Sequence, residues 1–437
     1  PRLWMETFSL ILKSLGLKQC KTDPCLFCLF DEDGNLLVIV VVYCDDCIIA
    51  GRSKWVIQIK IGISGQVKIS DLGNLKRHLG VDYEFGCDAH GPYIRSSMTE
   101  YLDSMVRDFE KDMSSSIKTF STPGAAVTPP LRSSPDDEII LNEMFRSYVG
   151  RIMFACGKTE PTLSNACREL TAHLTAPNEE HWAALKHLMG YIKQGTNQGI
   201  MMRAPKDIRV VAFVDSDYAS DRGDRKSISG HLVTVGGCLV SWQSKKQTGV
   251  TLSSTEAEFV AMSMVATEVN GPPVLPSILN EDNTGAIFMA KNTAIGQRTK
   301  HVDIRYRFVN DMILAKELWV EHIRSGENPS DAMTKNLPLA LFGKHASIIS
   351  DGLLGSLYDP QNTEDVKSYC ATVDVPSDTV PCGQCSNYNG TLATCSVDRG
   401  PEVDSDEGWT TIHPKSKRGK SNVQSMEDQR TFSSGSI

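Results

Sequence analysis

Four acidic side chains in the middle of the chain are placed so that their carboxylates could meet at one edge of a sheet. They are Asp215, Glu258, Asp282 and Asp331, and each lies at the end of an expected strand or the start of an expected helix. Two divalent ions about 3.5–4 Å apart can hold the attacking and leaving oxygens of a phosphodiester when several carboxylates converge on them. An ordered set of four such acids therefore points to two-metal phosphodiester hydrolysis, whereas a single acid would mean little.

The first acid follows a short apolar run, 211–214 (Val-Ala-Phe-Val). A strand that ends in an acid places a carboxylate at the carboxyl edge of a sheet, where metal and phosphate sites commonly lie. Alternation along a strand puts Asp215 and Asp217 on the same face, so the residues alone do not choose between them. Either acid also has an explanation as a solvated turn residue.

Two glutamates open the next expected helix, and they must have different roles. Residues two apart on a helix point about 200° away from each other. Ser253 and Glu256 fit the Ser-x-x-Glu capping box, so helix initiation explains Glu256. Glu258 has no such local role, and it can face the sheet edge that carries Asp215.

The last two acids also have local explanations. Asp282 lies between an expected strand and an expected helix, where an N-cap acid is common. Asp331 follows Pro329 in the first turn of a short helix, where the helix dipole favours negative charge. These separate explanations do not account for four acids at the ends of elements along one edge of the same sheet.

The elements that must position these acids can be read from the apolar pattern. The pattern predicts strands at 210–214, 231–235, 239–242, 274–279 and 318–323. It predicts helices at 255–269, from 284, at 302–314 and from 329, the first cut short by Asn270-Gly-Pro-Pro273. Three strands followed by alternating helices and strands indicate a mixed α/β sheet.

The front of the chain has a separate β signal. The run from Leu36, LLVIVVVYCDDCIIAG, gives two short apolar strands around Asp45 and Asp46, which predicts a hairpin with the acids at its tip. A helix is expected at 4–15. From 101 to 194 the periodicity is helical, and Asn178 is an expected N-cap for a helix whose apolar face includes Trp182.

Composition limits the classes of protein that the chain can belong to. A length of 437 residues and a hydrophobic content of 41% predict two or three domains, each with a hydrophobic core. The formal net charge is −8, but residues 339–437 hold 8 basic and 13 acidic residues, so they contribute −5 and the rest only −3. A basic nucleic-acid groove therefore remains compatible with the charge of the folded part.

The same composition bears on compartment and order. From the start at Pro1 we expect no secretory leader, and the longest apolar run, Leu36 to Val42, is far short of the ~20 residues of a membrane span. The thirteen dispersed cysteines suit a reducing compartment. We therefore expect an intracellular protein, cytoplasmic or nuclear, with no membrane segment. Beyond about residue 356 few large apolar residues occur, which predicts disorder.

The cysteine spacing offers one competing site. Cys25-x2-Cys28 and Cys44-x2-Cys47 match the spacing of a zinc ribbon. The second pair brackets two aspartates, and a hydrophobic strand separates the pairs where glycine-rich knuckles would be needed. Zinc binding is therefore disfavoured.

The acid-bearing segments resemble the ribonuclease H domain of Ty1/copia-type retrotransposon Pol polyproteins over residues 210–338. The matching motifs are Asp215-Ser-Asp-Tyr-Ala, Asp224-Arg-Lys-Ser-Ile-Ser-Gly, Ser241-Trp-Gln-Ser-Lys-Lys-Gln, Ser253-Ser-Thr-Glu-Ala-Glu, Glu281-Asp-Asn, Arg298-Thr-Lys-His-Val-Asp and Asp331-Ala-Met-Thr-Lys. The resemblance implies a mixed five-stranded α/β sheet with flanking helices. It implies that Asp215, with Glu258, Asp282 and Asp331, holds two Mg²⁺, with Mn²⁺ as a second candidate ion.

The resemblance also implies a substrate, the RNA strand of an RNA–DNA hybrid. Selection for the hybrid would come from 2′-hydroxyl contacts and from the A-like duplex shape. Four basic residues near the motifs are candidate phosphate contacts, Lys245, Lys246, Arg298 and Lys300.

The first half resembles the C-terminal part of the reverse transcriptase palm of the same family. The matching motifs are Pro1-Arg-Leu-Trp, Lys21-Thr-Asp-Pro-Cys-Leu-Phe, Tyr43-Cys-Asp-Asp and Asp71-Leu-Gly-Asn-Leu-Lys. In the family the Asp-Asp pair, here Asp45 and Asp46, shares metal with an aspartate of an upstream strand that this sequence lacks. We therefore expect a residual polymerase motif without polymerase activity in this chain alone.

These resemblances predict four regions. They are a partial reverse transcriptase palm at 1–90, a mostly helical thumb or connection at 91–205, a ribonuclease H-like domain at 206–340 and a largely disordered tail at 341–437. Two alternatives stay open. One is a polymerase completed by upstream sequence or by a second subunit, and the other is an inactive remnant that still binds nucleic acid. If the element is active, the rest of the polyprotein and a virus-like particle are the expected context.

Overall fold

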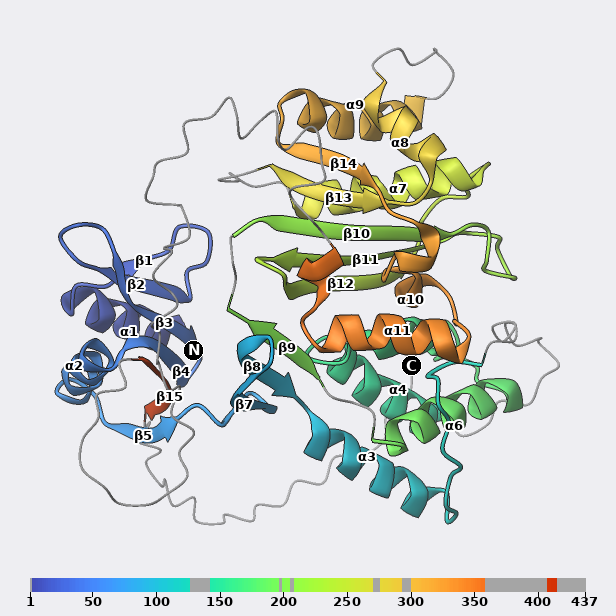
Figure 1. The fold of residues 1–437 in the computed structure, drawn as a ribbon. Coiled ribbons are helices and arrows are strands. Elements are labelled where there is room, and N and C mark those ends of the chain that lie inside the picture. The colour runs from blue at the N-terminus through green and yellow to red at the C-terminus, as the bar shows by residue number, and fades with distance from the viewer. Residues whose placement is uncertain are drawn as a thin grey trace, which may run out of the picture. The chain divides into compact units, whose positions relative to one another are not determined.

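The structure is a computed structural model that describes residues 2–125, 142–195, 199–204, 208–269, 276–292, 300–357 and 407–414. The chain packs as two compact units (Figure 1). The first comprises Pro1–Leu75 with Val397–Ile437, and the second comprises Lys76–Ser396. The boundaries of the four predicted regions stay predictions.

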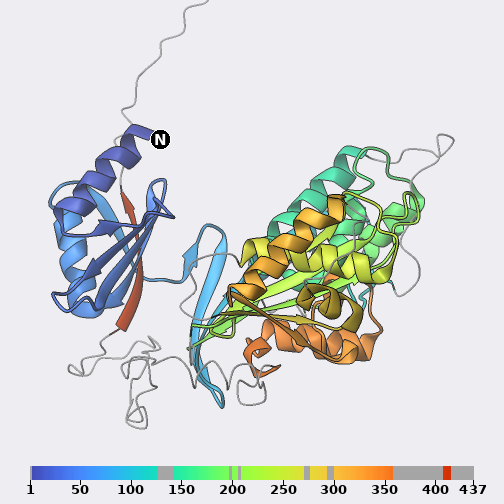
Figure 2. The ribbon, with the colours of Figure 1, turned by 90° about the horizontal axis from the view of Figure 1, so that it is seen from above.

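The first unit is built on a six-stranded sheet covered by two helices. The strands are β1 (Lys18–Gln19), β2 (Leu26–Phe30), β3 (Leu36–Tyr43), β4 (Asp46–Arg52), β5 (Ile69–Asn74) and β15 (Glu407–Pro414). The helices are α1 (Arg2–Ser14) and α2 (Ser53–Ser64). Both lie on the same side of the sheet (Figure 2), where Phe8 and Ile59 pack against Val40 and Ile49.

The expected hairpin around the Asp-Asp pair is confirmed. Strands β3 and β4 pair antiparallel up to Tyr43 and Asp46, so Cys44 and Asp45 form a two-residue turn. Cys44 adopts a positive φ of 51°, as tight hairpin turns require. The acids therefore lie at the tip of the hairpin, as the apolar pattern predicts.

Two segments of 341–437, the region predicted to be largely disordered, form regular elements. Helix α11 (Leu339–Ser350) continues into this stretch and buries Phe342, His345 and Ile349. Strand β15 lies between β4 and β5 and pairs antiparallel with both. β15 is held by backbone hydrogen bonds to its two neighbours. Amino-acid composition carries no information about such pairing. The remainder of the predicted tail, 358–406 and 415–437, lies outside the described residues.

The second unit begins with a four-stranded sheet and a helical region. The strands are β6 (Arg77–His78), β7 (Val81–Asp88), β8 (Gly91–Ser97) and β9 (Ile200–Arg203), and the helices are α3 (Thr99–Asp112), α4 (Asn142–Cys156), α5 (Ser164–Thr171) and α6 (Glu179–Lys193). The predicted N-cap of α6 is confirmed, because Asn178 Oδ1 accepts hydrogen bonds from the backbone N–H of Glu180 and His181. Trp182 is buried on the apolar face of this helix, as predicted.

A five-stranded mixed sheet forms the rest of the second unit, in the order β12-β11-β10-β13-β14. The strands are β10 (Val210–Asp217), β11 (Ile228–Val235), β12 (Cys238–Lys246), β13 (Ser277–Glu281) and β14 (Leu318–His322). β10 pairs antiparallel with β11 and parallel with β13, which pairs parallel with β14. The predicted mixed α/β sheet with five strands is therefore confirmed.

Helices cover both faces of this sheet, and the burial pattern shows which strand residues face which layer. α7 (Ser254–Glu268), α8 (Thr284–Lys291) and α9 (Lys300–Leu314) share a core with Ala212, Val214 and Leu279. On the other face, α4, α6, the four-residue helix α10 (Asp331–Thr334) and α11 share a core with Val211 and Phe213. The alternation of period two along β10 thus assigns each of its side chains to one layer.

Candidate metal centre

Asp215 lies inside β10, because this strand runs to Asp217, beyond the predicted end at 214. It follows Val211 and Phe213 at steps of two, so its side chain lies on the α10 face of the sheet. It is 2% exposed, and its Oδ2 accepts a hydrogen bond from the Thr334 hydroxyl. The Lys335 ammonium lies 3.4 Å from its other carboxylate oxygen.

The loop before α10 fixes the second acid beside the first. The buried Asn328 donates from Nδ2 to the carbonyl of Val214 at 2.8 Å, and its Oδ1 accepts from the Ser330 hydroxyl at 2.5 Å. This ties the start of α10 to the strand position just before Asp215. Asp331, 5% exposed, is therefore held at the same strand end, and the Lys335 ammonium lies 3.1 Å from its Oδ1.

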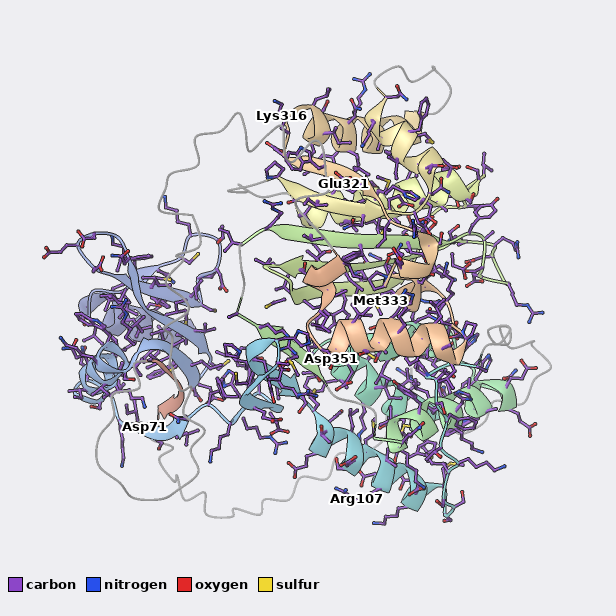
Figure 3. The ribbon with its side chains drawn as sticks, viewed as in Figure 1. Asp71, Arg107, Lys316, Glu321, Met333 and Asp351 are labelled. Atoms are coloured by element: carbon purple, nitrogen blue, oxygen red, sulfur yellow. The ribbon has the colours of Figure 1, made fainter. Side chains whose placement is uncertain are left out.

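A glycine allows α10 to approach the sheet this closely. Gly230 of β11 is directly opposite Asp215 in the β10–β11 register. A Cβ at Gly230 would lie 2.6 Å from Met333 Cβ and 2.6 Å from Thr334 Cγ2. Figure 3 labels Met333, which lies in α10 against the strands. Only glycine leaves room for this packing.

Asp282 follows β13 directly, and its predicted alternative as an N-cap is wrong. The cap of α8 is Asn283, whose Oδ1 accepts from the backbone N–H of Ala286 at 3.0 Å. Asp282 is therefore free of the capping role. In contrast, Ser253 caps α7 as predicted, and Glu256 accepts from the N–H of Leu252 at 2.7 Å.

Two groups of carboxylates converge at this edge of the sheet, and they share Asp282. Ligand oxygens of Asp215, Asp282 and Asp331 lie within 4.8 Å of one another, as do those of Glu258, Glu281 and Asp282. Opposite ligands of one Mg²⁺ are about 4.2 Å apart at bond lengths near 2.1 Å. Each group thus has the spacing of oxygens around one cation. All four acids singled out from the sequence belong to one group or the other.

Glu281 is an acid that the sequence analysis did not assign to the site. It is fully buried at the end of β13. Because Leu279, two residues earlier, packs against the α7 layer, alternation places Glu281 on the α7 face with Glu258. In the sequence, the signal for this position is the alternation of period two along β13.

The pKa values of the buried acids are raised first by burial and then by repulsion between the acids. Burial, then Glu281 and Asp215, raises the pKa of Glu258 to about 11. Burial and the Asp215 charge raise the pKa of Asp331 to about 7, and burial raises the pKa of Glu281 well above its ordinary value. The raised pKa values of Glu258, Glu281 and Asp331 show that further positive charge beside Lys335 would stabilise their ionised forms.

The donor set fits a hard divalent cation such as Mg²⁺ or Mn²⁺. All the converging groups are carboxylates, the ligands that these ions prefer. Oε2 of Glu258 and Oε2 of Glu281 are buried and have no hydrogen-bond partner among the described residues. Buried anionic oxygens without donors are costly, and a bound cation would satisfy them.

The predicted phosphate contacts have different surroundings. Lys246, at the end of β12, lies 2.8 Å from Asp221 and 3.1 Å from Asp224, so its charge is already partly compensated. Lys245 beside it is exposed. Lys300 opens α9, but its side chain is outside the described residues, as is all of Arg298.

The residual polymerase motif and the cysteines of the first unit are not members of these carboxylate groups. Asp45 is exposed in its turn and Asp46 is half-buried. Within the described residues, every group of three side chains with ligand spacing consists of Asp and Glu from the second unit, so neither this pair nor Cys25, Cys28 and Cys47 belongs to one. In the same residues, no helix combines the length and hydropathy required to cross a bilayer.

Comparison with known proteins places the chain in a family. Residues 1–123 match the family model described as reverse transcriptase (RNA-dependent DNA polymerase). The chain is 30% identical over 355 residues to the retrovirus-related Pol polyprotein from transposon TNT 1-94 of Nicotiana tabacum, covering 77% of this chain and 26% of the relative. It is 28% identical over 362 residues to that from transposon RE1 of Arabidopsis thaliana, covering 80% and 24%. The chain thus spans about a quarter of these relatives.

Two solved structures are also similar. A crystal structure of LC11-RNase H1 in complex with RNA/DNA hybrid matches 29% of this chain and 94% of its own, with 12% identity and a TM-score of 0.24. The foamy viral protease-reverse transcriptase in complex with RNA/DNA hybrid matches 55% and 29%, with 10% identity and a TM-score of 0.33. With the sequence relatives, the sheet order and the acidic cluster together, the chain belongs to the copia-type retrotransposon Pol polyproteins, as a reverse transcriptase region followed by a ribonuclease H-like domain.

Proposed function

We propose that the ribonuclease H-like domain hydrolyses the RNA strand of RNA–DNA hybrids with Mg²⁺ or Mn²⁺. The single observation that carries this proposal is the convergence of Asp215, Glu258, Asp282 and Asp331 in two groups that share Asp282. Bound ions would supply an activated water and stabilise the leaving 3′ oxygen. The proposal gives metal-ligand roles to these four residues.

The other residues of the centre position and balance these ligands. Thr334 orients Asp215 through its hydroxyl, and Asn328 holds the loop that carries Asp331. Lys335 offsets part of the negative charge of Asp215 and Asp331. The burial of these groups keeps bulk water from screening the charges of the centre.

Binding of the hybrid would rely on contacts between lysine side chains and phosphates of the nucleic-acid backbone. Lys245 is the exposed member of the basic pair at the end of β12, and it is our preferred phosphate contact. Lys246 would contribute less because Asp221 and Asp224 already share its ammonium. Contacts to 2′-hydroxyls would distinguish the RNA strand.

Cleavage of a labelled hybrid with Mg²⁺ tests the proposal, with two glutamates of one helix as a matched pair. Glu258→Gln removes a proposed ligand and should lower cleavage at least about 100-fold. Glu256→Gln, two residues away, removes only an exposed capping contact and should keep cleavage within about twofold. Hybrid binding without any cleavage by the wild-type chain would identify an inactive remnant and overturn the proposal.

A polymerase is the second candidate function, favoured by the family match over residues 1–123. Asp45 and Asp46 lie at the tip of their hairpin, but within the described residues no third acid joins them with ligand spacing. We therefore expect no primer extension by this chain alone. Extension that appears only when a second polypeptide is added would support a polymerase completed in trans.

A further inference from the structure

Glu281 is a fully buried carboxyl group for which neither the fold nor the four proposed ligands gives a reason. It ends β13, a strand whose five residues are all buried. An ionisable residue in such a strand is expensive unless it is paired or binds a cation. The question is therefore what faces this carboxylate.

Among the described residues, the donors beside Glu281 are the backbone N–H groups of Asn283 and Asp282. Oε1 of Glu281 accepts from the backbone N–H of Asn283 at 2.8 Å, and its Oε2 has no partner among the described residues. The nearest ionisable groups are Glu258 and Asp282, whose ligand oxygens lie within 4.8 Å of its own. Oε2 of Glu258 also has no partner in the described part of the chain. Two buried acids thus present unsatisfied oxygens in the same group.

Glu258 and Glu281 lie on a different face of the sheet from Asp215 and Asp331. Asp215 and Asp331 meet on the α10 face of the sheet, whereas Glu258 projects from α7 and Glu281 lies on the α7 face. Asp282, just beyond the end of β13, belongs to both groups. Two cation positions on either side of one shared carboxylate follow from this arrangement.

We propose that Glu281 is a metal ligand and that, with Glu258 and Asp282, it forms a second position for a hard divalent cation. Asp282 also belongs to the group that Asp215 and Asp331 form. The proposal rests on the proposed function, since it adds a fifth carboxylate to the same centre. It assigns Glu281 a role that the four-acid pattern of the sequence does not contain.

Manganese titration of the full chain tests this assignment, with bound Mn²⁺ counted by electron paramagnetic resonance. The wild-type chain should bind two ions in the centre. Glu281→Gln keeps the shape of the side chain and should weaken one of the two ions by about tenfold or more, leaving the other within about twofold. Glu256→Gln on α7 is the matched control and should bind both ions as the wild type does.

Thermal unfolding without metal gives an independent readout. A ligand role predicts that Glu281→Gln raises the midpoint in EDTA, since it removes a buried acid from a repulsive pair, and that added Mn²⁺ stabilises the variant less than the wild type. If the variant binds both ions with wild-type affinity, Glu281 is a protonated partner of Glu258 and the inference is overturned.

The results also separate this inference from the proposed nuclease activity. If cleavage requires Glu258 while Glu281→Gln still binds two ions, Glu281 is not a fifth ligand and the proposed nuclease activity stands. Suppose instead that the wild-type chain binds two ions but cleaves no hybrid, and that Glu281→Gln loses one of the ions. This result would support the ligand role of Glu281 and overturn the nuclease.

Discussion

At the scale of single residues, Asp282 connects the two carboxylate groups. Its position after β13 was evident from the sequence, but its interpretation as an N-cap was wrong, because Asn283 performs that role. The choice between Asp215 and Asp217 came from the family resemblance, and the structure gives Asp215 the ligand spacing. Alternation along β13 places Glu281 on the α7 face, but tertiary packing is needed to bring it beside Glu258.

The hydroxyl of Thr334 should matter for metal binding more than for stability. Thr334→Val keeps the shape of the side chain but removes the donor to Asp215 Oδ2. We expect Mn²⁺ affinity at the Asp215 position to fall about tenfold, because oriented ligands bind more tightly. Isothermal titration of both chains measures this. Thr267→Val is the control, since the Thr267 hydroxyl bonds only to the Ser263 carbonyl of its own helix. Equal losses in the two variants would contradict the positioning role.

Glu160 should make stability depend on pH. It is 2% exposed, and burial raises its pKa to about 8 from an ordinary value of 4.5. The folded state therefore holds this proton more tightly than the unfolded state. Its stabilising contribution is complete below about pH 4.5 and is lost as the pH rises through about 8.

Urea unfolding at pH 6 and pH 9 checks this sign. The wild-type chain should lose on the order of a few kcal/mol more than Glu160→Gln over this interval, because glutamine cannot ionise. A variant with the same pH dependence as the wild type would show that Glu160 stays uncharged, or is compensated, across the interval.

At the scale of elements, the apolar pattern predicts the five strands of this sheet in their order along the chain. It does not predict their lengths. β10 and β11 extend to 217 and from 228, beyond the predicted 210–214 and 231–235. The extra residues are Asp215, Ser216 and Asp217 in β10 and Ile228, Ser229 and Gly230 in β11, so apart from Ile228 they carry no apolar signal. Pairing between Asp215 and Gly230, which no local pattern reveals, continues these strands into the metal centre.

The close packing of α10 on β11 should make Gly230 intolerant of a side chain. Gly230→Ala would place a methyl group 2.6 Å from Met333 Cβ and should cost about 1–3 kcal/mol through overpacking. It should also weaken Mn²⁺ binding, since α10 carries Asp331. Chemical unfolding and metal titration measure the two effects.

An exposed helical glycine supplies the control for this substitution. Gly150 in α4 has nothing within 4 Å of an added Cβ, so Gly150→Ala should stabilise by about 0.5–1 kcal/mol without changing metal binding. A Gly230→Ala chain that binds Mn²⁺ like the wild type would show that α10 adjusts without moving its ligands.

At the scale of the whole molecule, the chain divides into two compact units, of which the first includes a strand from the C-terminal region. Composition predicts disorder there because the segment has few large apolar residues. It does not report backbone pairing, and β15 pairs on both edges, with β4 and with β5. The metal centre lies wholly in the second unit and does not depend on this strand.

Removal of 397–437 should therefore loosen the first unit alone. Without β15, one edge of β4 loses its hydrogen-bonding partner, so amide exchange in peptides covering 46–52 should rise at least about tenfold. Peptides covering β10 in the second unit should exchange as before. Unchanged protection in β4 would mean that β15 does not pair there in solution.

We propose that five carboxylates at one sheet edge hold two divalent ions. Anomalous diffraction from crystals of the full chain grown with Mn²⁺ would locate these ions. We expect two peaks about 3.5–4 Å apart, one bounded by Asp215 and Asp331, the other by Glu258 and Glu281, with Asp282 between them. Fully occupied crystals without a peak at this edge, or with Asp282 contacting neither ion, would contradict it.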